Sequence, residues 1–199
     1  MARPKNQAAR RGQLKQAARR AIAERGIEGV RIKDVAEQAG LSSQAVLYYY
    51  PELDTLIEEA IQHVVERFAE RRQETVDGID DPREALVALI DAGLPTGPDD
   101  DDLRMTYDAA GYFRDNPMLG ALIRSMTARQ VEVYRRVLEL GASQGAFTLA
   151  DTSQAIARNL VALEDAYGLY MISGGDVAAE ARRMILSFAG MATGCRLAE

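Results

Sequence analysis

Short polar residues at the start of one predicted helix are the clearest candidates for chemistry in this sequence. They are Ser42, Ser43, Gln44 and Ala45. A glutamine amide can bridge the edge of an adenine, and an alanine methyl can contact the methyl group of thymine. Helix ends also bind phosphate oxygens. These residues therefore predict a segment that reads DNA.

Three consecutive tyrosines continue the same segment. Tyr50 is expected to pack inward against the next helix, whereas Tyr48 and Tyr49 can present their hydroxyls to phosphates, because neighbouring helical residues point in different directions. The alternative is that the tyrosines form only an amphipathic rim at the edge of the core.

The spacing of small and aliphatic residues predicts how this segment is held. Two helices that cross steeply need a small side chain at the crossing, positive φ in the turn and an aliphatic side chain from the second helix. Ala36, Gly40 and Val46 meet these requirements, and Leu41 is expected to close the core beneath them. The sequence predicts a helix-turn-helix over residues 33–50, whose second helix enters the major groove.

Apolar residues recur at helical spacing along most of the chain, and no segment alternates convincingly with a period of two. The clearest stripe runs from Leu53 to Phe68, in a helix that Pro51 is expected to begin and that continues to about Arg72. Glycine and proline clusters separate the stripes. The sequence therefore predicts an all-α protein of about nine helices.

Charge divides the chain into a basic and an acidic part. Residues 1–50 contain 10 Lys or Arg and 4 Asp or Glu, a balance of +6, whereas the remaining 149 residues contain 14 and 26, a balance of −12. A basic module on an acidic body suits a protein that brings only its first part to a polyanion. Charge alone leaves an alternative equally open, a basic surface with no partner.

Several other protein classes are disfavoured. GASQG at 141–145 has the hydrolase nucleophile pattern, but a helical segment precedes it and the only histidine, His63, comes before Ser143. No second His or Cys stands at metal-ligand spacing. The single Cys195 excludes an internal disulfide and suits a reducing cytoplasm. No run approaches the roughly 20 apolar residues of a membrane span. We expect a cytoplasmic protein that is no enzyme, without cofactor, metal or membrane partner.

Over Ala17–Ile61 the sequence resembles the TetR family of transcriptional regulators. The first predicted helix ends in AERG and is followed by VRIKDVAEQAGLSSQAVLYYYPELDTL. The resemblance implies an N-terminal three-helix DNA-binding domain with the helix-turn-helix, residues 1–51. It also implies a C-terminal helical domain, residues 52–199, that binds a ligand and dimerises through its last two helices.

Two positions depart from the family pattern. Leu47 stands where most members have a tyrosine that contacts the phosphate backbone, and Leu53 stands where they have a lysine. The first two tyrosines of the run, with Arg31 and Lys33, are expected to replace these contacts with DNA.

The last two predicted helices have the pattern of a dimer interface. Segments 152–173 and 176–193 are apolar on more than one face and carry small residues that allow close contact. Pairing with the same helices of a second copy would give a symmetric four-helix interface, although a monomeric core is the alternative. A dimer would hold two recognition helices about 34–36 Å apart.

Aromatic residues and carboxylates are frequent in the second predicted domain, and together they can hold a cation through ring faces and charge. The candidate ligand residues are Tyr107, Tyr112, Phe113, Met126, Tyr134, Glu164, Tyr167 and Tyr170. Core packing and pairing with arginines is the more common role of such residues. The segment LVALEDAYGLYMISGG also resembles the choline-responsive branch of the family, which favours a cationic effector.

Two classes of function remain open. The favoured one is a ligand-responsive regulator, a repressor that binds a palindromic operator in double-stranded DNA as a homodimer and leaves it when a small-molecule effector binds. The alternative is an architectural or interaction protein that uses the same module without an effector. In the first case, a tilt of the helix that begins near Leu53 would move the recognition helices.

Overall fold

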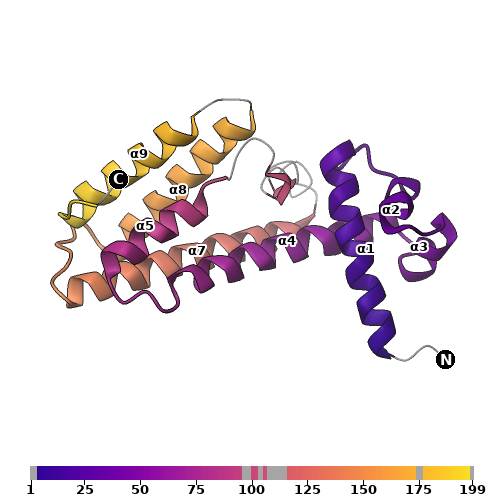
Figure 1. Cartoon of the computed structure of the whole chain (residues 1–199), viewed down its shortest axis with the longest axis horizontal. Coiled ribbons are helices and arrows are strands. Elements are labelled where there is room, and N and C mark those ends of the chain that lie inside the picture. Colours follow the sequence, from indigo (N-terminus) through magenta and orange to yellow (C-terminus); the bar gives the residue numbers. More distant parts are fainter. Residues whose placement is uncertain (1–3, 96–99, 103–104, 107–115, 174–176, 198–199) are drawn as a thin grey trace. The chain divides into compact units, whose positions relative to one another are not determined.

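The computed structural model describes residues 4–95, 100–102, 105–106, 116–173 and 177–197, and over these it consists of helices and their connections (Figure 1). The helices are α1 (Pro4–Arg25), α2 (Ile32–Ala39), α3 (Ser43–Tyr49), α4 (Leu53–Val76), α5 (Pro82–Gly93), α7 (Pro117–Ser143), α8 (Ser153–Ile172) and α9 (Ala178–Thr193). The predicted all-α class is confirmed, with eight helices in the described residues against about nine expected.

Pro51 does not begin α4, contrary to the sequence-based prediction. The helix begins at Leu53, and Pro51 lies in the bend that follows α3. Because a proline disfavours helical geometry in the residue before it, Tyr50 ends α3 with φ −137° and ψ 89°. The helix also continues past Arg72 to Val76.

The chain forms two compact units. The first contains Met1–Glu66 and Asp101–Leu122, and the second contains Arg67–Asp100 and Ile123–Glu199. Helices α4 and α7 each contribute residues to both units. The boundary predicted between residues 51 and 52 separates a DNA-binding domain from a ligand-binding domain, and it stays a prediction.

The core of the first unit is built from one face each of α1 to α4. Its buried apolar side chains include Leu14, Ala17, Ala18, Ala21, Ile22, Val35, Ala36, Val46, Tyr50, Leu56, Ile57, Ala60 and Ile61. On α1 these positions follow the three- and four-residue spacing of an amphipathic helix. Burial of this stripe fixes which faces of α2 and α3 remain in solvent.

Two adjacent carboxylates on α4 anchor other parts of the first unit. Glu58 accepts a hydrogen bond from the side-chain amide of Asn116. Asn116 in turn caps α7, because its Oδ1 accepts from the backbone N–H groups of Met118 and Leu119 at 3.1 and 3.2 Å. The next residue, Glu59, binds residues of α1 and the end of α3, as described below.

The second unit has a continuous apolar core formed by α5, α7, α8 and α9. Its fully buried members include Leu86, Leu89, Ile90, Tyr134, Leu138, Leu160, Ile185 and Ala189. Among the described residues, no helix has the length and apolar character needed to cross a membrane.

Candidate functional site

The start of α3 places three of the four predicted DNA-reading residues in solvent, whereas Ala45 is half-buried. Ser42 is the N-cap, and its hydroxyl accepts a hydrogen bond from the Ala45 N–H at 3.2 Å. Ser43 and Gln44 follow in the first turn and are exposed, whereas Val46 is completely buried on the other side of the helix. The cap and the buried valine therefore fix α3 while its first turn remains free to meet a partner.

The turn between α2 and α3 has the geometry of a tight helical corner. Gly40 has a φ of 65°, in the left-handed region that only glycine enters without strain. The N–H groups of Gly40 and Leu41 donate to the carbonyls of Glu37 and Ala36 at 3.1 and 2.9 Å, which closes the end of α2. Ala36 is buried and Leu41 is half-buried.

Polar contacts hold α2 against α1. The Arg20 guanidinium donates to the Gln38 carbonyl at 2.9 Å, and the Gln13 amide donates to the Ala39 carbonyl at 3.1 Å. The Gln38 amide donates to Glu24 at 2.8 Å. The first two bonds satisfy carbonyls in the last turn of α2, where a helix leaves its acceptors unpaired, and all three hold α2 against α1.

Tyr50 joins the end of α3 to α1 and α4. Its ring is buried, its hydroxyl donates to Glu59 Oε2 at 2.7 Å, and the Arg11 guanidinium lies 4.4 Å from the ring centroid. Arg11 also donates to Glu59 Oε1 at 2.6 Å. Burial, followed by the hydrogen bond to Glu59, raises the pKa of Tyr50 to about 12. Sequence reasoning missed Arg11 and Glu59, because no local pattern marks partners so far apart in the chain.

The other two tyrosines lie at the surface of α3. Tyr48 is 77% exposed, and its ring meets the half-buried ring of Tyr49 edge to face, with 5.1 Å between centroids. Leu47, where the family resemblance expects a tyrosine, is also exposed. Tyr48 is thus open to solvent on α3, and its predicted contact with DNA stays a prediction.

The two basic candidates at α2, Arg31 and Lys33, differ in their contacts. The Arg31 guanidinium donates to the carbonyls of Glu28 and Val30 at 2.8 and 2.9 Å, so it braces the loop before α2. Lys33 is exposed in the first turn of α2. Leu53, where the family resemblance expects a lysine, is half-buried at the start of α4.

The predicted ligand residues do not form one cluster. Tyr107, Tyr112 and Phe113 lie outside the described residues. The other predicted residues are three buried side chains, Met126, Tyr134 and Glu164, and two tyrosines of α8, of which Tyr167 packs half-buried against the core and Tyr170 is exposed. Those two rings pack edge to face with centroids 6.1 Å apart. Of the three buried side chains, Tyr134 and Glu164 are in contact: the Tyr134 hydroxyl donates a hydrogen bond to the Glu164 carboxylate.

A buried arginine, Arg72 of α4, completes this polar cluster. Its Nη1 lies 3.0 Å from Glu164 Oε2, and its Nη2 donates to Glu164 Oε1 at 3.1 Å. Burial opposes the charge of the guanidinium, but the carboxylate outweighs that effect and raises the pKa of Arg72 above its usual value. Sequence reasoning treated this arginine as the end of a helix, because nothing near it in the chain signals a buried partner.

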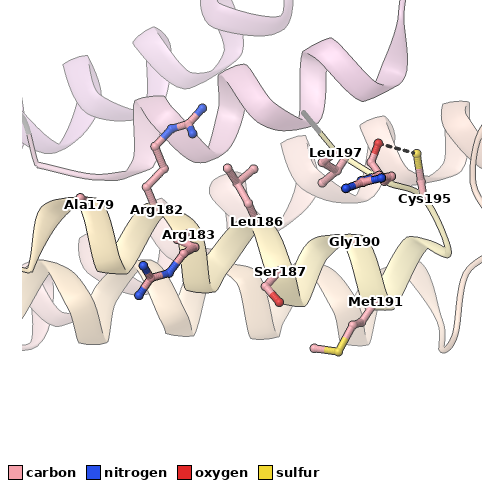
Figure 2. Close-up of a pocket in the computed structure, with 10 residues that line it drawn as sticks. Ala179, Arg182, Arg183, Leu186, Ser187, Gly190, Met191, Cys195 and Leu197 are labelled. Carbon is pink, nitrogen blue, oxygen red and sulfur yellow. Dashed lines mark hydrogen bonds between the residues drawn. The ribbon is translucent and has the colours of Figure 1, made fainter. Parts of the chain in front are cut away.

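A shallow groove of about 1100 Å³ runs along α9 (Figure 2). Arg183, Ser187 and Met191 project from one side of the helix, whereas Leu186 points toward the core. Met191 is 71% exposed, and Met184 and Leu169 are also exposed. Large apolar side chains gathered on two neighbouring helices form a surface suited to another protein.

Residues 14–60 match the family model of bacterial regulatory proteins of the tetR family. This segment contains the capped start of α3, the glycine turn and the buried Val46 described above. Over these residues the chain is similar to the DNA-binding segment of that family, which confirms the family resemblance found in the sequence.

Sequence relatives are DNA-binding regulators. The chain is 36% identical over 86 residues to the HTH-type transcriptional regulator BetI of Burkholderia ambifaria, covering 43% of this chain and 44% of the relative. It is 24% identical over 145 residues to the HTH-type transcriptional repressor KstR2 of Mycolicibacterium smegmatis, covering 72% and 70%. Both relatives are named as transcriptional regulators and not as enzymes, in agreement with the predicted class of function.

Solved structures share the fold over nearly the whole chain. One from Saccharomonospora viridis, described as a transcriptional regulator in complex with choline, has a TM-score of 0.82, 27% identity and coverage of 91% of this chain and 95% of the other. A TetR transcription regulator from Haloarcula marismortui has a TM-score of 0.83 at 22% identity, covering 94% and 99%. At 22% identity, the similarity to the Haloarcula marismortui structure shows a shared fold and nothing further.

Proposed function

We propose that this chain is a dimeric repressor that binds a palindromic operator and is released by a small-molecule effector. The proposal depends on one observation: one side of the α3 segment is buried and the other is exposed to solvent. Val46 and Tyr50 are buried, whereas Ser42, Gln44 and Tyr48 are exposed. A helix held in this way can enter a major groove with its first turn at the base edges and its tyrosine toward the backbone.

The groove along α9 supports a homodimer formed by α8 and α9. Met191 in this groove is exposed in a single chain, and a second copy would cover it with the same surface. Small residues on α9, including Ala179 and Gly190, line the groove and allow a partner helix to approach closely. In the dimer, two copies of α3 engage successive turns of the major groove, which accounts for a palindromic site.

Footprinting of the purified full-length protein on DNA that flanks its own gene tests this function. A regulator of this type protects one palindrome and releases it when an effector is added. An architectural protein protects DNA broadly, with affinity set by salt and not by sequence. Broad protection at every DNA tested would therefore replace the proposed function with the architectural alternative.

A further inference from the structure

The exposed side of α3 is polar in its first turn and apolar in its second. The side chains of α3 that face solvent are Ser43, Gln44, Leu47 and Tyr48. Residues three or four apart share one face of a helix, so these side chains form one continuous strip. Burial of Val46 on the opposite side holds the strip outward. A leucine that is 42% exposed therefore lies within the surface that the proposed function brings to DNA.

Leu47 cannot contribute to this surface through a polar contact. Its side chain has no donor or acceptor for a phosphate oxygen or for the polar atoms of a base edge. In the major groove the base edges present mainly donors and acceptors, and the C5-methyl group of thymine is the apolar exception. An alkyl group pressed against a polar edge removes its water without replacing the lost hydrogen bonds. Leu47 therefore suits a thymine and disfavours a cytosine, which presents an amino group and no methyl group.

The position of Gln44 limits where that thymine lies. Gln44 precedes Leu47 by three residues, which is a rise of about 4.5 Å along the helix. Successive bases of one strand are about 3.4 Å apart. With the Gln44 amide on an adenine edge, Leu47 reaches the next base pair or the one after it. α3 contains no arginine or lysine, the side chains that most often bind guanine, so the strip as a whole favours A·T pairs.

Ala45, the sequence-based candidate for contact with a thymine methyl group, is less accessible than Leu47. Its side chain is half-buried, and its N–H group donates to the Ser42 hydroxyl in the cap of α3 at 3.2 Å. Leu47 is exposed and carries three more carbon atoms, so it extends further from the helix axis. Of the apolar side chains of α3 near Gln44, Leu47 is the better placed to reach a base.

We propose that Leu47 is a specificity-determining residue that contacts the C5-methyl group of a thymine, within two base pairs of the adenine that Gln44 reads. The inference rests on the proposed function and adds the class of base step that the operator contains. Loss of the methyl group from the DNA and loss of the leucine side chain from the protein remove the same contact. The two changes are therefore not additive in their effect on binding.

Exchange of thymine for deoxyuridine removes this methyl group and nothing else. Duplexes that bind the full-length wild-type protein are first selected from a random-sequence library. Each thymine of the selected duplex is then replaced in turn by deoxyuridine, and affinity is measured by fluorescence anisotropy. We expect one thymine in each half-site at which the exchange weakens wild-type binding by about three- to fivefold, the effect of one methyl group lost from an apolar contact.

A pair of leucine variants identifies the residue that meets the methyl group. Leu47→Ala should bind the thymine and deoxyuridine duplexes equally, and alanine favours the helix at this exposed position. Leu140→Ala is the matched control, because Leu140 lies on α7 and is 44% exposed, close to the exposure of Leu47. It should lose as much affinity as wild type does on the same exchange. The effect of deoxyuridine on wild type needs no variant, so the test holds even if a variant misfolds.

Two results would overturn the inference. One is a selected duplex in which no thymine methyl group affects wild-type binding. The other is a methyl effect of the same size in wild type and Leu47→Ala, which would assign the methyl group to another residue such as Ala45.

The selection step tests the proposed function separately. A library that yields no common palindrome would overturn the proposed operator binding, and this inference with it. A common palindrome whose thymines can all be exchanged without loss of affinity would retain the proposed function and remove only the role of Leu47.

Discussion

The Tyr50 hydroxyl donates to Glu59 Oε2 at 2.7 Å, so the last residue before the bend after α3 is tied directly to α4. Tyr50→Phe removes this bond and keeps the buried ring. We expect the free energy of unfolding to fall by about 1.5–3 kcal/mol, the net contribution of a hydrogen bond to a charged group. Urea denaturation measures the change. Tyr48→Phe is the control, because Tyr48 is mostly exposed and its hydroxyl should not affect stability.

Glu59 should make stability sensitive to acid. Partial burial opposes its charge, but hydrogen bonds from Tyr50 and Arg11 outweigh burial and lower the pKa of the carboxyl below its usual value. A carboxyl with a lowered pKa stabilises the fold above its unfolded-state pKa of about 4.3, and this contribution is lost as pH falls through the folded value. Between about pH 5 and pH 3, wild type should therefore lose stability more steeply than Glu59→Gln. Parallel curves from denaturation at each pH would contradict the assignment.

DNA binding should separate the roles of two residues on α3. Gln44→Ala is expected to weaken binding to the operator by about 1–3 kcal/mol and to relax preference at one base pair. Tyr48→Phe should weaken binding to operator and unrelated DNA alike, by about 0.5–1.5 kcal/mol, because a phosphate contact carries no sequence information. Fluorescence anisotropy with matched and scrambled duplexes measures both. If Tyr48→Phe bound DNA with unchanged affinity, the Tyr48 hydroxyl would have no contact with the phosphate backbone.

Two glycines within helices should respond in opposite directions to alanine. At Gly93 a new Cβ would lie 2.1 Å from Glu164 Oε1, so Gly93→Ala should destabilise the protein by about 1–3 kcal/mol. At Gly12 no atom lies within 4 Å of the new Cβ, and Gly12→Ala should stabilise α1 by about 0.5–1 kcal/mol. Thermal and chemical denaturation compare the pair. Equal effects would show that Gly93 does not pack tightly on the ion pair.

The proposed dimer should depend on the exposed side of α9. Met191→Glu places a carboxylate in an apolar interface, and we expect the dissociation constant of the dimer to rise by about tenfold or more. Sedimentation velocity over a concentration series measures it. Met118→Glu is a control, because Met118 is also exposed but lies on α7. Equal effects of the two substitutions on the dissociation constant would show that α9 does not form the dimer interface.

Local patterns in the sequence predicted much of the fold and little of its polar network. The turn before α3 was predictable, because Gly40, Ala36 and Val46 act within one short segment. The Arg72 and Glu164 pair was not, since 92 positions separate its members and no periodicity marks a buried charge. Tyr50 shows both cases. The different directions of neighbouring helical residues indicated that Tyr50 turns inward, but not that it meets Arg11 and Glu59.

Glu58 and Glu59 attach α4 to two different neighbours. Successive helical residues point about 100° apart, so these two side chains reach different neighbours from a single turn of backbone. One meets the amide that caps α7, and the other meets the arginine and phenol beside the recognition helix. A roll of α4 about its own axis would therefore strain both attachments together, so the orientation of the helix-turn-helix relative to α4 depends on that single turn.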